Sequence, residues 1–128
     1  MSGVSQRFAL VTGALLAALG VGLGAFGAHG LQSFLGAREL QWWQTAVQYQ
    51  MWHAIGLLAI GAAGRRDFFG PAVMIAAGTV VFSGSLFVMA LTGMRFLGMV
   101  TPFGGGLMIL GWLWLAWRAR RVVGSIFG

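Results

Sequence analysis

The chain has no cysteine and no lysine, and only two of its 128 residues are acidic, Glu39 and Asp67. Without cysteine there is no disulfide framework, thiolate nucleophile or thiolate-bound zinc site, and without lysine no Schiff base can form. Two carboxylates also leave little material for the paired acid–base chemistry of hydrolases. These absences remove most classes of catalytic site, and we expect the protein not to be an enzyme.

Charge of either sign is scarce. Charged residues make up 8% of the chain and hydrophobic residues 59%, whereas soluble domains usually carry about 25% charged residues to cover their surface. The eight basic residues are all arginines scattered between apolar stretches, while nucleic-acid binding requires them to cluster on one face. The composition therefore predicts a protein whose partner is the lipid bilayer and not a nucleic acid.

Four stretches are apolar enough to cross a bilayer, which takes about 20 residues. They cover residues 8–28, 43–64, 71–93 and 101–117. Every backbone amide must find a partner inside the hydrocarbon, so segments of this length are expected to be helices. We predict an all-α membrane protein with one domain, residues 1–128, folded as a four-transmembrane-helix bundle.

The arginines predict the orientation of this bundle. Six of the eight would lie at the N-terminus, between the second and third stretches, and at the C-terminus, against two in the opposite loops. Because cytoplasmic loops are enriched in basic residues, we expect both termini to be cytoplasmic. Local ion pairs are expected between Glu39 and Arg38, and between Asp67 and either Arg65 or Arg66.

The first stretch is rich in small residues, which let helix backbones approach closely in lipid. At about 100° per residue, two faces of this helix carry small residues almost throughout. One face has Gly13, Ala17, Gly20, Gly24 and Gly27, and the other has Ala14, Ala18, Gly22, Ala25 and His29. Two smooth faces imply two close neighbours. We therefore expect this glycine-rich helix to be the central one of the bundle, unless one face contacts another subunit.

A few polar residues fall at membrane depth, where such groups are costly and often functional. Tyr49, Gln50 and His53 are predicted to share one face of the second helix, with His53 near the midplane. One hypothesis is a structural imidazole that pairs with a hydroxyl or carbonyl group of a neighbouring helix. The other is a binding or conduction site for a small molecule, lipid, quinone or proton.

The third helix brings Ser83 and Ser85 to a similar depth. Two residues apart on a helix means about 200°, so the serines cannot both face one pocket. We expect one of them to bond back to its own helix at i−4, and a hydrogen bond between this region and His53 is plausible from the depths. A His53–serine pair lacks a third group to orient the imidazole, which makes it a poor catalytic triad.

His29 lies where the first helix reaches the outer interface. Two histidines in a four-helix bundle also raise the hypothesis of haem b, with one imidazole on each side of the iron. The depths disagree with this hypothesis, because His53 is central and His29 is near the edge. We therefore expect no cofactor and no metal.

Four ordered blocks resemble the "domain of unknown function 423" family of small bacterial inner-membrane proteins, which has a eukaryotic transmembrane relative. The blocks are Gly24–Leu31, Thr45–Gln50 with His53-Ala54, Phe82–Leu86, and Thr101–Gly105 with Gly111-Trp112. The resemblance implies a four-span protein of the bacterial inner (plasma) membrane and adds no established reaction. It also implies a set of motif residues, namely His29, Tyr49, Gln50, His53, Ser83, Ser85 and Pro102.

These observations favour a non-catalytic membrane protein that acts by packing, as a homo-oligomer or as a partner subunit of another membrane protein. The motivation is the lack of catalytic groups beside an excess of small residues suited to close helix contacts. Two alternatives stay open: binding or passage of a small molecule, lipid, quinone or proton around His53, and a haem b redox protein.

Overall fold

The computed structural model describes residues 3–127, with side chains described for residues 3–122. Its elements are four long helices and two short 3-10 helices. In chain order they are α1 (Gly3–His29), α2 (Ala37–Ala63), η1 (Arg66–Phe68), α3 (Phe69–Thr92), η2 (Arg95–Met99) and α4 (Thr101–Phe127). The prediction of an all-α protein is confirmed over the described residues.

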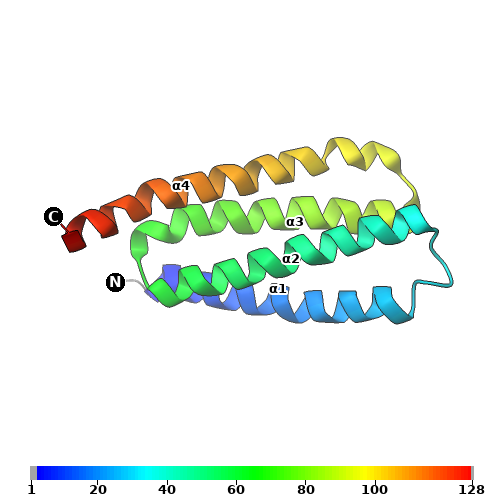
Figure 1. Cartoon of the computed structure of the whole chain (residues 1–128), viewed down its shortest axis with the longest axis horizontal. Coiled ribbons are helices and arrows are strands. Elements are labelled where there is room, and N and C mark those ends of the chain that lie inside the picture. The colour runs from blue at the N-terminus through cyan, green and yellow to red at the C-terminus, as the bar shows by residue number, and fades with distance from the viewer. Residues whose placement is uncertain (1–2, 128) are drawn as a thin grey trace.

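The four helices lie side by side as a row in chain order, with α1 and α4 at the two edges (Figure 1). Each helix packs mainly against its neighbours in the chain, and α1 makes only a minor contact with α3. Successive helices run in opposite directions, so both chain ends lie at the same end of the bundle, measured along the helix axes (Figure 1). The α2–α3 connection with its arginines lies there as well.

The expectation that α1 is the central helix is wrong. Only 17% of its most apolar window is buried, against 50% for α3. One of its two small faces packs on α2, whereas the second face is exposed along its whole length, at Ala14, Ala18, Gly22, Ala25 and His29. Small residues permit a close neighbour without requiring one, and for this reason the second face did not predict a second helix.

The α1–α2 contact is a seam of glycines spaced by seven residues, Gly13, Gly20 and Gly27. A Cβ atom at Gly13 would lie 2.9 Å from the carbonyl oxygen of Ala54 in α2. At Gly27 it would lie 2.5 Å from the indole of Trp43. Both distances are too short for real carbon contacts, so this seam depends on glycine.

A second glycine seam joins α3 to α4. A Cβ atom at Gly78 would lie 2.7 Å from the backbone nitrogen of Met108, and one at Gly104 would meet the backbone nitrogen of Phe82. Gly111 faces Ile75 in the same way, at 2.6 Å from its Cγ1. Of the three consecutive glycines at 104–106, Gly104 is the one in this close contact.

The helices extend past the apolar stretches that predicted them. α2 begins at Ala37 and α4 continues to Phe127, beyond the expected limits of 43 and 117. A helix can continue past the hydrocarbon because its polar side chains are compatible with the headgroup region. α2 and α3 end where Gly64 and Gly93 take the left-handed conformation, with φ of 67° and 73°, which is typical of helix C-termini.

Three segments of the described chain are long and apolar enough to cross a membrane: Gly3–His29, Arg66–Thr92 and Arg95–Val122. α2 is as long as α1, at 27 residues. Its mean hydropathy is too low to meet the same criterion, because its first half is rich in glutamine. The four-helix fold therefore contains one helix that is more polar than its neighbours.

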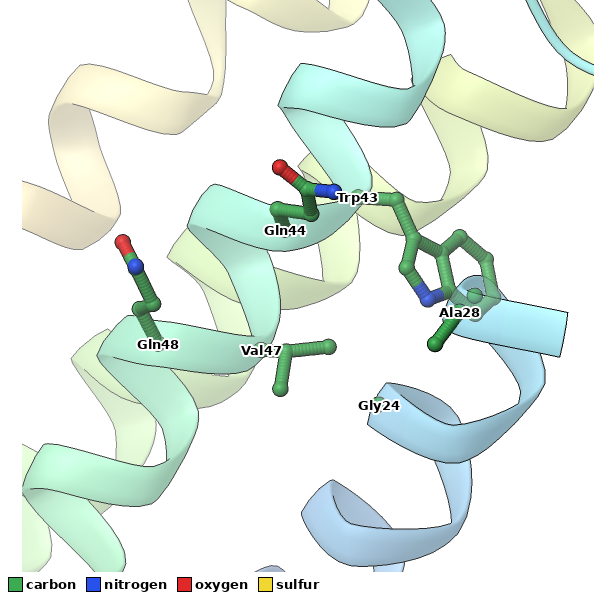
Figure 2. Close-up of a pocket in the computed structure, with 7 residues that line it drawn as sticks. Gly24, Ala28, Trp43, Gln44, Val47 and Gln48 are labelled. Carbon is green, nitrogen blue, oxygen red and sulfur yellow. The ribbon is translucent and has the colours of Figure 1, made fainter. Parts of the chain in front are cut away.

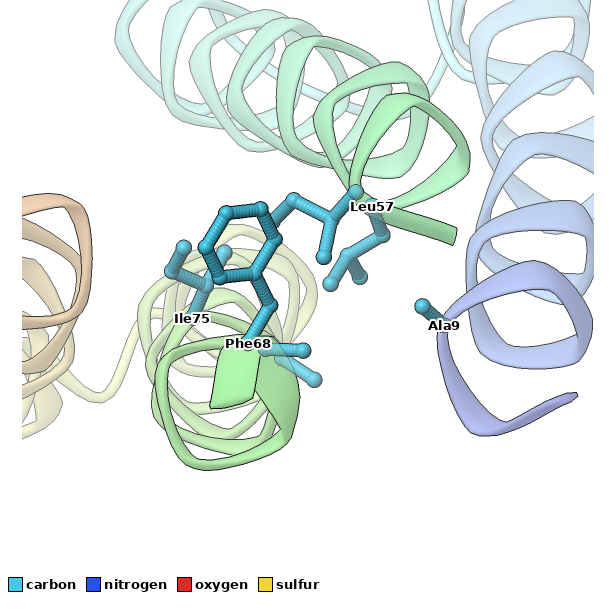
Figure 3. Close-up of a cluster of buried hydrophobic side chains, with 7 residues drawn as sticks. Ala9, Leu57, Phe68 and Ile75 are labelled. Atoms are coloured by element: carbon cyan, nitrogen blue, oxygen red, sulfur yellow. The ribbon is translucent and has the colours of Figure 1, made fainter. Parts of the chain in front are cut away.

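The largest apolar cluster lies toward the arginine-rich end of the row, where Ala9, Leu57, Phe68 and Ile75 point toward one another from α1, α2, η1 and α3 (Figure 3). The hydroxyl of Ser5 donates to the carbonyl oxygen of Arg65 at 3.1 Å and ties the start of α1 to the α2–α3 connection. The two expected ion pairs are confirmed, Arg38–Glu39 and Arg65–Asp67, each at 3.1 Å.

Candidate functional site

His53 lies in the second half of α2 and is buried, with 9% of its surface exposed. Its Nδ1 lies 2.7 Å from the carbonyl oxygen of Tyr49, one turn earlier. A carbonyl oxygen can only accept a hydrogen bond, so Nδ1 carries a proton and donates it. In a neutral imidazole the other nitrogen, Nε2, is then a free acceptor. The chain's own backbone thus fixes the tautomer of His53.

His53 lines a recess of about 260 Å³ between α2, α3 and α4. The other lining residues are Tyr49 from α2, Phe82 from α3, and Gly105, Met108, Ile109 and Trp112 from α4. The His53 ring stacks on Tyr49 with an interplanar angle of 14° and lies 5.8 Å from the Trp112 ring. Among the described residues, no side chain or backbone group is hydrogen-bonded to His53 Nε2.

The absence of a side chain at Gly56 makes room for this arrangement. A Cβ atom there would lie 2.7 Å from Cη2 of Trp112, so the indole fits only because α2 has a glycine one turn after His53. Tyr49 also contacts Phe82, with ring centroids 4.6 Å apart. The recess is therefore an apolar, largely aromatic pocket that carries one imidazole acceptor and the Tyr49 phenol.

Gln50 does not belong to this recess, contrary to the expectation that it shares a face with Tyr49 and His53. Its side-chain nitrogen donates to the carbonyl oxygen of Leu16 in α1 at 2.8 Å. One residue along a helix is a rotation of about 100°, which is enough to turn Gln50 toward α1 while its neighbours face α4. Gln50 therefore ties two helices together.

The two serines face different helices, as their spacing predicted. Ser83 donates to the carbonyl oxygen of Ala46 in α2 at 2.8 Å. Ser85 bonds back to its own helix, at 2.9 Å from the Phe82 carbonyl oxygen, and lies 2.6 Å from the Thr101 hydroxyl at the start of α4. The back-bond is at i−3, not at the expected i−4. The expected hydrogen bond between this region and His53 is not formed, because both hydroxyls are engaged elsewhere.

A second recess, of about 210 Å³, lies between α1, α2 and α3. Gln50, Thr79 and Ser83 are on its wall, but each already donates to a backbone carbonyl group, and for Thr79 the acceptor is Ile75 at 2.8 Å. The two hydroxyl donors are thus used within the chain, and only the second amide N–H of Gln50 is left to donate to a ligand.

His29 is the last residue of α1 and is exposed. α1 lies at one edge of the row, whereas the recess beside His53 opens between α2, α3 and α4. The two imidazoles therefore do not face a common space, and the geometry gives the haem b hypothesis no support.

Sequence reasoning missed the α4 side of the recess. The Trp112 ring lies against His53 and Gly56. Trp43 was missed as well, and it is buried, with its Nε1 donating to the carbonyl oxygen of Leu23 at 2.8 Å. The available signal was the glycine that each indole covers, Gly56 and Gly27.

The fold is that of a helical membrane protein. It has four long helices, of which α1, α3 and α4 are apolar enough to cross a bilayer, and α2 carries a buried imidazole. The family model described as "Protein of unknown function (DUF423)" matches residues 23–105. The chain belongs to this family, as the four sequence blocks predicted.

The relatives carry membrane names as well. The UPF0382 membrane protein SSP2132 of Staphylococcus saprophyticus is 47% identical over 109 residues, which cover 83% of this chain and 91% of the relative. The UPF0382 inner membrane protein YgdD of Escherichia coli is 41% identical over 127 residues, which cover 96% of this chain and 92% of the relative. No solved structure shows a significant match to this chain.

Proposed function

We propose that this protein is a four-span, non-catalytic protein of the bacterial inner (plasma) membrane that binds a small apolar molecule carrying a hydroxyl group. The binding site is the recess beside His53. α2 is treated as the fourth span because its 27 residues give a length of about 40 Å, and because it packs between α1 and α3. A helix in that position crosses wherever its two neighbours cross.

The observation that carries the proposal is the unpaired Nε2 of His53. A polar group in an apolar environment is expensive when it lacks a hydrogen-bond partner. Here the acceptor belongs to a residue on the wall of a recess of about 260 Å³, so a ligand in the recess could supply the missing donor. The Nδ1–H group is already used by Tyr49, which limits the imidazole to accepting.

This donor–acceptor arrangement selects the chemistry of the ligand. A hydroxyl can donate to Nε2, whereas a quinone or an ester offers only acceptors, which could pair with the Tyr49 phenol but would leave Nε2 without a donor. The walls are the rings of Tyr49, Phe82 and Trp112, which suit a flat or short-chain apolar body. Phenols, quinols and lipid alcohols combine both properties.

The geometry favours binding over a role confined to packing. The packing hypothesis depended on an excess of small residues. The seams at Gly13, Gly20 and Gly27 and at Gly78 and Gly104 use part of this excess within the chain's own fold, and the second small face of α1 is exposed. A catalytic role has little support because the nearby serine hydroxyls are committed to backbone carbonyl groups.

The test uses the fact that the chain has two histidines. Protein labelled with ¹⁵N-histidine in lipid nanodiscs gives two imidazole spin systems, which nitrogen NMR resolves by tautomer. Titration with 4-butylphenol is expected to shift the Nε2 resonance of His53 and leave His29 unchanged, because only His53 lines the recess. His53→Phe preserves a ring and removes the acceptor, so it should abolish saturable binding.

The controls are matched in ligand and in protein. The methyl ether 4-butylanisole has a similar shape without the donor, and we expect its affinity to be at least about tenfold lower, which corresponds to about 1.4 kcal/mol. His29→Phe should bind 4-butylphenol like the wild type. Equal shifts at both histidines, or equal affinity for phenol and ether, would contradict the proposal.

A further inference from the structure

One exposed face of α2 carries three glutamines, Gln41, Gln44 and Gln48, which we refer to as the glutamine face. Their spacing of three and four residues places them on one side of the helix. The exposed residues that continue this side toward the end of α2 are apolar, including Trp52 and Ile55. Figure 2 shows Gln44 and Gln48 extending from α2, with Gly24 and Ala28 of α1 nearby.

Two members of the glutamine face, Gln44 and Gln48, lie within the span that we propose for α2. The middle residue of Ala37–Ala63 is Gln50, so Gln48 is about 3 Å along the axis from the helix centre and Gln44 about 9 Å. A hydrocarbon core about 30 Å thick therefore includes both side chains. Lipid tails offer no hydrogen bond to a primary amide, and an amide without partners in an apolar medium is costly.

The amides of Gln44 and Gln48 have no hydrogen-bond partner among the described residues. Gln50 provides the internal comparison, because it lies on the same helix and donates to Leu16 of α1. Only the amides that face away from the row are left unpaired. Their partner must therefore come from outside this chain.

We infer that the partner is a second copy of this chain, docked through the glutamine face. A primary amide has both donors and an acceptor, so two identical amides satisfy each other. Copies in one membrane share one orientation, and a two-fold axis along the membrane normal places each glutamine opposite its counterpart at the same depth. The three side chains carry no formal charge, so this self-pairing meets no repulsion.

The surface next to the glutamine face can accommodate such a neighbour. A groove of about 230 Å³ runs between α1 and α2 and is lined by Gly24, Gly27, Ala28, Trp43, Gln44, Val47 and Gln48. Its α1 wall consists of residues no larger than alanine, which allows close approach of another helix in lipid. The groove and the amides thus form one continuous surface, separate from the His53 recess.

Cysteine crosslinking tests this dimer directly, since the chain has no cysteine of its own. Gln44→Cys and Gln48→Cys are each expected to form disulfide-linked dimers in native membranes on mild oxidation, because residues facing a two-fold axis can reach disulfide distance. Val80→Cys is the matched control. It lies near the middle of α3 and is 58% exposed, but on a different helix, so it should crosslink far less.

Association without cysteine provides the second measurement. In lipid bilayers, Förster transfer between labelled copies should report a dimer, and Gln44→Leu/Gln48→Leu should weaken its association constant by about tenfold or more. The double variant replaces polar groups by apolar ones on a lipid-exposed face, so its fold is expected to be kept. A monomeric wild type, equal crosslinking at Val80, or an unchanged constant in the double variant would overturn the inference. So would glutamine-dependent association with a different protein alone. None of these outcomes depends on ligand binding at His53.

Discussion

At the scale of single residues, Trp43 joins three helices. The indole covers Gly27 of α1, donates its N–H to the Leu23 carbonyl oxygen, and packs edge-on against Phe87 of α3 at 4.6 Å between ring centroids. The sequence did not indicate this role, because position in a sequence shows the depth of an aromatic ring and not the direction in which it points.

Replacing Trp43 by phenylalanine removes one interhelical hydrogen bond and part of the buried ring. Interhelical hydrogen bonds in membrane proteins are worth about 0.6 kcal/mol on average, and the lost packing adds to this. We expect Trp43→Phe to lower the free energy of unfolding by about 1–2 kcal/mol, measured by steric trapping in bicelles. Trp52→Phe is the control, since Trp52 is on the same helix but 58% exposed; an equal loss in both variants would contradict this role.

The polar residues show how far the sequence could predict a site. The divergent directions of Ser83 and Ser85 and both ion pairs followed from spacing alone. The rotation that separates Gln50 from Tyr49 did not, because it depends on which neighbour each face of α2 meets. The wall formed by Trp112 also required the order of the helices in the row.

At the scale of elements, the two glycine seams determine which helices approach most closely. In the α3–α4 seam, a Cβ atom at Gly104 would meet backbone atoms of α3, with the Gly78 carbonyl oxygen at 2.9 Å. Backbone atoms cannot rotate away as a side chain can, so any relief requires the helices to separate. This makes Gly104 the most demanding position of the seam.

The neighbouring glycine provides the contrast. A Cβ atom at Gly106 meets nothing within 4 Å. We expect Gly104→Ala to destabilise the protein by about 2 kcal/mol or more, as overpacking does. Gly106→Ala should be neutral or stabilising by up to about 1 kcal/mol, because alanine is the better helix former. Thermal unfolding in one detergent, followed by circular dichroism, compares them, and a similar loss in both would argue against the seam.

The same seams explain what could be predicted about the elements. All four helices were expected because long apolar runs have no alternative to helix in lipid. Their order was not, since α1 offered two smooth faces and only the one that meets Trp43, Met51 and Leu58 of α2 is used. A face of small residues allows close contact without requiring it. Whether contact forms depends on large residues of other helices that fit against this face.

At the scale of the whole molecule, positive charge is concentrated at the end of the bundle where the two chain termini lie. Arg118 and Arg121 lie over the rings of Trp114 and Trp117, at 4.8–5.9 Å from the ring centroids, and Arg65 lies over Phe68 at 5.6 Å. Arginine beside aromatic rings is typical of a membrane–water interface. Six of the eight arginines share this end, so we expect it to face the cytoplasm.

Labelling of single cysteines in intact bacterial cells tests this orientation without altering the charge. Val4→Cys lies near the start of α1 and Phe34→Cys lies in the α1–α2 connection, and both positions are exposed. A membrane-impermeant maleimide should label Phe34→Cys from outside, and Val4→Cys only after the inner membrane is permeabilised. The reverse pattern would show that the arginine-rich end faces outward.

The hydrogen bonds between α1 and α2 also bear on how the chain reaches the bilayer during synthesis. α2 is the helix that falls short of the hydropathy of its neighbours, and two of its inward polar groups, Trp43 and Gln50, donate hydrogen bonds to carbonyl oxygens of α1. α1 leaves the ribosome first and is strongly apolar, with a mean hydropathy of 2.0 over its best window. α1 can therefore insert first and offer hydrogen-bond acceptors to α2, which would insert poorly alone. We therefore expect the unit of membrane insertion to be the α1–α2 hairpin and not the individual helix.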